Sequence, residues 1–176
     1  MTWHYTGVGS KRTPNLILDV MTSIAGMLSS EGWILRSGGA DGADTAFEKG
    51  VTNNHLKEIY VPWIGFNNRV SRQDIVVCDP KAFEIAQRIH PAWLKLEKGS
   101  QKLHARNVHQ VLGRTLNTPS RFLICWTPGG LPIGGTRTAI MVAKEWEVPV
   151  YNLGELAPGK IVPAKHLENI LKLAEE

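Results

Sequence analysis

Short apolar runs alternate along the chain with longer segments of helical spacing. In the first of these longer segments, Leu16, Ile17, Val20, Ile24 and Leu28 recur every one to four residues and form one apolar stripe. Strands are predicted at 3–6, 33–35, 58–61, 121–126 and 149–151, and helices at 13–32, 44–51, 80–90, 100–116, 136–146 and 163–175. This alternation predicts an α/β fold, with a Rossmann-like, mostly parallel sheet covered by helices on both faces.

The chain has 176 residues, of which 43% are hydrophobic, and we expect one domain over residues 1–176. Thr13 is expected to cap the first helix, with Pro14 at its first position. The sequence contains no apolar run of about 20 residues and no secretory pattern, which predicts a cytoplasmic protein without a membrane partner. Cys78 and Cys125 lie in apolar runs and are expected to be reduced core thiols. The spacing of Cys and His residues predicts no metal site.

Three glycine-bearing turns follow predicted strands. They span residues 7–12, 37–44 and 127–137, and each precedes a segment of helical spacing. Glycine lets an anion approach the main chain, and a helix N-terminus offers free N–H groups and the positive end of the helix dipole. Because ligands bind at the carboxyl ends of parallel strands, we expect all three turns to open into one cleft.

Candidate ligand-binding residues come from these turns and from the predicted helix 100–116. A net charge of +4 suits an anionic ligand without proving one. Thr136 and Arg137 can both donate to a phosphate, and Trp126 either stacks on a base or covers the core. The predicted ligand- or phosphate-binding residues are Gly9, Ser10, Lys11, Ser37, Gly38, Gly39, Asp41, Asp44, Arg106, Asn107, Trp126, Gly129, Gly130, Gly134, Gly135, Thr136 and Arg137.

Some of these residues have an equally simple structural interpretation. Asp41 and Asp44 could both be helix caps and nothing more. Asp44 could alternatively accept a hydrogen bond from a ribose hydroxyl. The polar and aromatic loop Trp63–Arg69 suits base and phosphate contact, or forms an ordinary lid. His104 and His109 are expected to be surface or helix-packing residues.

The order of these motifs resembles the Rossmann-like core of the DNA-processing protein DprA, also called Smf. The resemblance is carried by Gly7–Lys11, Ser37–Asp44, Arg106–Asn107 and Gly134–Ala139, and it covers roughly residues 5 to 152. It implies a binder of single-stranded DNA or of a nucleotide-type ligand, with no cofactor. Sibling families form dimers, and by that analogy we expect a homodimer.

The same superfamily includes the Lonely Guy (lysine decarboxylase-like) nucleotide hydrolases, from whose motif the chain departs. Pro128–Gly130 and Gly135–Thr136 are similar to parts of that motif, but its glutamate falls near Ala139. Phe47 stands where DprA has a histidine. The residues therefore favour a non-enzymatic binder.

Two other functions stay open. One is an N-glycosidic hydrolase acting on a nucleoside monophosphate or an ADP-ribose derivative. Its oxocarbenium-like transition state requires a carboxylate, for which Asp41 and Asp44 are the candidates. The other is a sensor or sponge for a nucleotide signal.

Overall fold

The computed structural model describes residues 2–77, 79–155, 168–170 and 172. Its centre is a six-stranded sheet in the order β4-β3-β2-β1-β5-β6, and all neighbouring strands are parallel. The strands are β1 (His4–Gly7), β2 (Ile34–Ser37), β3 (Lys57–Val61), β4 (Ile75–Val76), β5 (Leu123–Cys125) and β6 (Val150–Asn152). The structure confirms the predicted Rossmann-like α/β fold.

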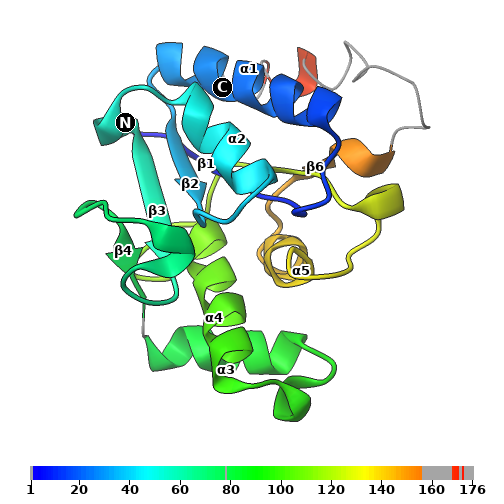
Figure 1. Cartoon of the computed structure of the whole chain (residues 1–176). Helices are drawn as coiled ribbons and strands as arrows, with labels where there is room; N and C mark the ends of the chain where they lie inside the picture. Colours follow the sequence, from blue (N-terminus) through cyan, green and yellow to red (C-terminus); the bar gives the residue numbers. More distant parts are fainter. Residues whose placement is uncertain (1, 78, 156–167, 171, 173–176) are drawn as a thin grey trace.

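Helices cover both faces of the sheet (Figure 1). α1 (Asn15–Ser30) and α2 (Ala43–Gly50) pack on one face. α3 (Pro80–Ile89), α4 (Lys98–Leu112) and α5 (Arg137–Glu145) pack on the other. This three-layer arrangement follows from parallel strands, whose connections run over one face of the sheet and usually contain a helix.

Each face of the sheet has its own apolar core. Tyr5 of β1 and Phe122 are fully buried beneath α1 and α2, and they share this core with the fully buried Phe47 of α2. Along β5, Leu123 faces the core on the opposite side, beneath α4 and α5, and Ile124 faces the core that contains Tyr5. This alternation explains why β5 reads as a continuous apolar run, because both of its faces are buried.

Several element boundaries differ from the predicted ones. Pro14 rather than Thr13 is the N-cap of α1, and the Thr13 hydroxyl instead donates to the Ser10 carbonyl at 2.7 Å. α4 ends at Leu112, before the predicted Leu116, because Gly113 at φ 79° turns the chain away. The short edge strand β4 was not predicted, because two residues are too few to show a period.

Other predictions fall at the edge of what the structure describes. The predicted helix 163–175 lies mostly outside the described residues, although Glu168–Ile170 are helical and Ile170 is buried. Cys125 is a buried free thiol, as predicted, and Cys78 lies outside the described residues. Within the described ranges, no helix is long and apolar enough to cross a membrane.

The strand order reverses between β1 and β5. From β1 the chain moves outward through β2, β3 and β4, and then returns to place β5 on the other side of β1. The connections that follow β1 and β5 lead to helices on opposite faces of the sheet, since α1 and α5 belong to different cores. Such a reversal opens a crevice at the carboxyl ends of the two strands, where ligands bind in folds of this type.

Candidate functional site

A cavity of about 490 Å³ lies at this strand reversal. All three predicted turns reach it: residues 8–12 follow β1, Ala40 and Asp44 follow β2, and residues 133–136 follow β5. Phe66 and one face of α4 form much of the remaining wall. The volume falls within the range of small-molecule sites, about 300–1,000 Å³. The sequence therefore correctly predicted that the turns meet in one cleft.

The turn after β5 presents bare main chain to the cavity. Gly134 adopts φ 66°, and a Cβ atom added at Gly134 or Gly135 would meet nothing within 4 Å. Among the described residues, no side chain caps α5, and its first turn contains no acidic residue. Thr136 and Ala139, at the start of this helix, line the cavity. The free N–H groups and the positive end of the α5 dipole therefore favour an anion at this point.

The turn after β1 brings two cations to the same cavity. Lys11 and Arg12 line it, both are exposed, and neither forms an ion pair with any described residue. The main-chain N–H of Ser10 donates to the Trp126 carbonyl at 3.1 Å, which fixes this turn to the end of β5. The two turns thus form one rim that carries positive charge.

Asp44, Arg106 and Gln110 form the cavity floor. Asp44 and Arg106 are 4% and 7% exposed, and Asp44 Oδ2 lies 3.9 Å from Arg106 Nη1. Nη1 donates instead to the Gly38 carbonyl at 2.6 Å. The ion pair is therefore long, and both members lie beneath the surface of the molecule.

Burial determines the protonation behaviour of this pair. Burial raises the pKa of Asp44 to about 6, although Arg106 and main-chain hydrogen bonds from Ala40, Gly38 and Gly9 lower it. Burial likewise lowers the pKa of Arg106, and Asp44 only partly opposes this effect. Asp44 is thus a carboxyl group able to gain or lose a proton near neutral pH, inside a cavity.

Two α4 residues of the wall, Leu103 and Gln110, are absent from the predicted site. The Asn107 side chain donates to the Gly135 carbonyl at 2.6 Å and joins α4 to the turn after β5. Gln110 is 1% exposed, and neither polar atom of its side chain has a hydrogen-bond partner among the described residues. Its position four residues after Arg106 on one helix places both on the same face. That spacing was the available signal, but a single glutamine in a helix is common.

Phe66 adds an aromatic ring to the wall. It lies in a short 3₁₀ segment (Phe66–Asn68), and the Arg106 guanidinium is 5.4 Å from its ring centre. The Asn67 amide donates to the Gly39 carbonyl at 3.1 Å and to Asp41 Oδ1 at 3.0 Å. These bonds hold the loop after β3 against the turn after β2, and the Phe66 ring lines the cavity.

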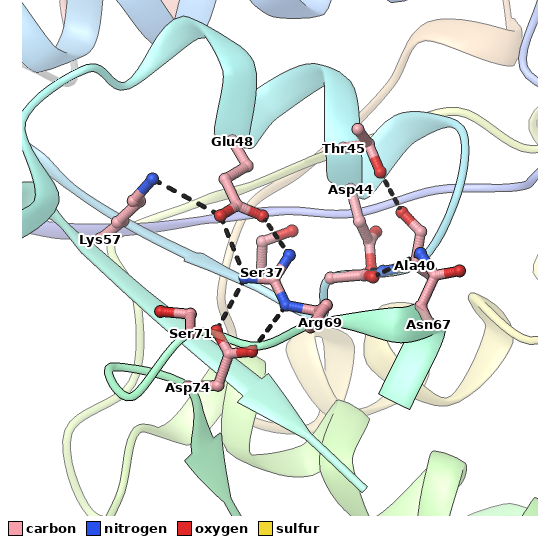
Figure 2. Close-up of polar contacts among 12 residues, drawn as sticks. Ser37, Ala40, Asp44, Thr45, Glu48, Lys57, Asn67, Arg69, Ser71 and Asp74 are labelled. Carbon is pink, nitrogen blue, oxygen red and sulfur yellow. Dashed lines mark hydrogen bonds and ion pairs between the residues drawn. The ribbon is translucent and has the colours of Figure 1, made fainter. Parts of the chain in front are cut away.

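Arg69, in the same loop, is not part of the cavity wall. Figure 2 shows the Arg69 cluster, which consists of Arg69, Glu48, Asp74 and Lys57. Arg69 donates two hydrogen bonds to Glu48 (2.7 and 3.0 Å) and two to Asp74 (both 2.7 Å). Although burial raises the pKa of Glu48, Arg69 and Lys57 lower it below its usual value. The hydrogen bonds with Asp74 and Glu48 raise the pKa of Arg69.

Several predicted site residues lie outside the cavity wall. The buried Ser37 hydroxyl donates to the Gly7 carbonyl at 2.7 Å, and Arg137 donates to the Ile89 carbonyl at 2.9 Å. Trp126 packs against the core beneath α1 and α2. Asp41 is exposed and accepts from Asn67. The remaining predicted residues outside the wall are Gly38, Gly39, Gly129 and Gly130. For all of these, ligand contact stays a prediction.

Solved structures confirm the fold. DNA processing protein A from Helicobacter pylori, described for its mode of binding single-stranded DNA, matches with a TM-score of 0.56 and 15% identity. That match covers 95% of this chain and 72% of the other. The Chlamydomonas rheinhardtii Moco carrier protein matches with a TM-score of 0.56 and 16% identity, over 100% of this chain and 99% of the other. No family model matches the chain, and no curated protein does.

These likenesses, at such low identity, concern the fold alone. They agree with the DprA resemblance that the motifs carry, and they place the chain among Rossmann-like α/β proteins. The cavity lies where proteins of this architecture hold their ligands.

Proposed function

We propose that this protein binds a small nucleotide-type ligand, with its phosphate held at the rim of the cavity. One observation carries the proposal: two glycine turns, the N-terminus of α5 and the cations Lys11 and Arg12 converge on a cavity of about 490 Å³. Main-chain N–H groups and unpaired cations bind phosphate oxygens. Phe66 and the cavity floor then suit a planar, hydrogen-bonding group.

The two structural neighbours are named for ligands of very different size. One neighbour binds single-stranded DNA, and the other is named as a carrier of Moco. A cavity of this volume holds one nucleotide-sized unit, and this favours a small ligand over a strand. Single-stranded DNA is the alternative, in which one nucleotide of the strand enters the cavity and the remainder contacts surface cations.

Binding experiments distinguish these ligands. We expect mass spectrometry of the denatured, purified protein to identify a phosphorylated small molecule, and calorimetry to show binding of nucleoside monophosphates. For oligothymidylates of increasing length, affinity should not rise with length. An affinity that rises with length and falls steeply with salt would instead establish the polynucleotide, because each neutralised phosphate releases a counterion.

The rim cations provide a matched test of the site. Replacing both Lys11 and Arg12 by Ala should weaken nucleoside monophosphate binding at least about tenfold, since each removes a charged hydrogen bond. Arg72→Ala is the control, because Arg72 is exposed and lies outside the cavity wall. Equal effects of the two changes would place the phosphate elsewhere.

Asp44 supports a second candidate function, an N-glycosidic hydrolase acting on a nucleoside monophosphate or an ADP-ribose derivative. It is the acidic residue of the cavity wall, and burial raises its pKa to about 6, a value suited to proton transfer. Chromatography would detect a free base released from the nucleotide. Hydrolysis predicts that Asp44→Asn abolishes release and that Asp41→Asn does not, because Asp41 is exposed outside the cavity wall.

A further inference from the structure

Gln110 is a buried amide without a partner in the wall of a ligand-sized cavity. Gln110 is 1% exposed, and within the described ranges neither Oε1 nor Nε2 of its side chain has a hydrogen-bond partner. The main-chain carbonyl of Gln110 accepts from the Thr6 hydroxyl at 2.7 Å, so the backbone at this position is fixed to β1. Burying an unpaired amide is unfavourable, and buried side-chain amides in proteins almost always have partners.

The residues around Gln110 leave room for its side-chain amide but form no hydrogen bond with it. A Cβ atom at Gly38 would lie 2.0 Å from Gln110 Nε2 and 2.3 Å from Arg106 Nη1. Glycine at position 38 therefore makes the room that the amide occupies, although its φ lies outside the left-handed region. Arg106 next to it is committed to the Gly38 carbonyl, and Asp44 accepts from the Ala40 N–H. The neighbouring polar groups are thus bonded to the main chain, and the amide is left unpaired.

We propose that Gln110 is a specificity-determining residue that recognises the heterocyclic ring of the ligand through a paired donor and acceptor. The inference rests on the proposed function, because it assumes that a nucleotide-type ligand enters the cavity. A carboxamide offers one acceptor and two donors. It matches a ring edge that carries a donor beside an acceptor, as the bases of nucleotides do. The ring would then lie toward α4 and Phe66, and the phosphate toward residues 10–12 and 134–136.

Gln110→Leu tests this assignment, because leucine keeps much of the side-chain volume and removes both polar atoms. The probes are the four ribonucleoside 5′-monophosphates and ribose 5-phosphate, which has no ring. For the nucleotide that the wild type binds best, we expect affinity to fall about tenfold or more. The affinity for ribose 5-phosphate should change less than about twofold, because the phosphate contacts are untouched.

Stability provides a second readout of the same variant. Removing an unpaired buried amide should raise the Tm of the ligand-free protein, by about 3 °C. Gln101→Leu is the matched control on α4, because the Gln101 amide donates to the Trp93 and Leu96 carbonyls at 3.4 Å. This control should lower the Tm and leave both affinities unchanged. The opposite signs of the two changes in Tm distinguish a glutamine that binds the ligand from one that stabilises the fold.

The possible results test the assignment of Gln110 and the proposed function separately. An unchanged ratio of nucleotide to ribose 5-phosphate affinity in Gln110→Leu overturns the assignment of Gln110 and leaves the phosphate site standing. A lowered Tm also overturns it, because the amide would then have a structural partner. Failure of the wild type to bind any of the five probes contradicts the proposed function itself, and the assignment with it.

Discussion

Asp44 and Glu48 lie one turn apart on α2, and they belong to two groups of charged side chains whose members are bonded in different ways. In the Arg69 cluster, Arg69 donates four hydrogen bonds of 2.7–3.0 Å to Glu48 and Asp74. In the cavity floor, Asp44 and Arg106 are separated by 3.9 Å. In the Arg69 cluster, short bonds join side chain to side chain and fix a loop. In the cavity floor, Asp44 and Arg106 bond mainly to the main chain, and within the described residues the side-chain amide of Gln110 beside them is left unpaired.

The comparison also shows why residue type alone is a weak guide to a site. The loop after β3 carries both Arg69 and Phe66, and the sequence suits each for ligand contact. The structure directs Arg69 into the Arg69 cluster and Phe66 into the cavity wall. A guanidinium with bonded carboxylates on two sides has little capacity left for a phosphate.

The largest expected effect comes from breaking the Arg69 cluster. Arg69→Met leaves Glu48 and Asp74, whose side chains are 19% and 9% exposed, without their principal partner. We expect the free energy of unfolding to fall by about 4 kcal/mol, as for other largely buried pairs that lose one member. Chemical denaturation measures this change. A loss below about 1 kcal/mol would show that the cluster does not hold the loop.

Asp44 in the cavity floor should make the stability of the protein depend on pH. The pKa of Asp44 is about 6 in the folded protein, against an ordinary value of 3.8. The contribution of Asp44 to the free energy of unfolding is therefore fully present below pH 3.8 and is lost as pH rises through about 6. Relative to Asp44→Asn, the wild type should lose about 3 kcal/mol of stability over that interval. Thermal unfolding of both proteins across pH gives the difference. If it stays constant with pH, Asp44 is not the buried acid described here.

Gly38→Ala adds a methyl group to the closely packed cavity floor. The added Cβ would lie 2.0–2.7 Å from Gln110, Arg106 and Asp44, and we expect a stability loss of about 2 kcal/mol and weaker nucleotide binding. Gly99→Ala in the first turn of α4 is the control, because the nearest atom would be 3.9 Å away. Calorimetry should show that the control gains a few tenths of a kcal/mol, since alanine favours helix. No loss of stability in Gly38→Ala would indicate that the floor tolerates the methyl group.

The smallest effect belongs to an exposed pair. Arg88 and Glu145 lie 2.6 Å apart, but their side chains are 58% and 39% exposed. Arg88→Ala should therefore change the free energy of unfolding by less than about 0.5 kcal/mol. A loss comparable to that of Arg69→Met in the same denaturation experiment would remove the distinction between the two kinds of ion pair.

The sequence predicted the sheet and the meeting of the turns because both follow from local signals. Apolar runs such as 121–126 mark buried strands, and glycines after them mark turns at one edge of a parallel sheet. The strand order was not predictable, because the position of β5 beside β1 depends on which face each connecting helix covers.

The site was predicted less fully, because it depends on side-chain partners far apart in the chain. Arg137 stands in a turn that suits phosphate, yet its guanidinium donates to Ile89, 48 residues away. Gln110 carries no local signal, since its importance comes from its burial and from the absence of a hydrogen-bond partner for its side-chain amide in the described part of the chain. Such relations appear only when the fold is formed.

An NMR titration with the ribonucleoside 5′-monophosphates shows directly whether a nucleotide binds at the rim of the cavity. We expect saturable shifts at the main-chain amides of residues 9–12 and 134–136, with the resonances of Glu48, Arg69 and Asp74 unmoved. Shifts confined to the Arg69 cluster, or no saturable shift at any resonance, would contradict this expectation.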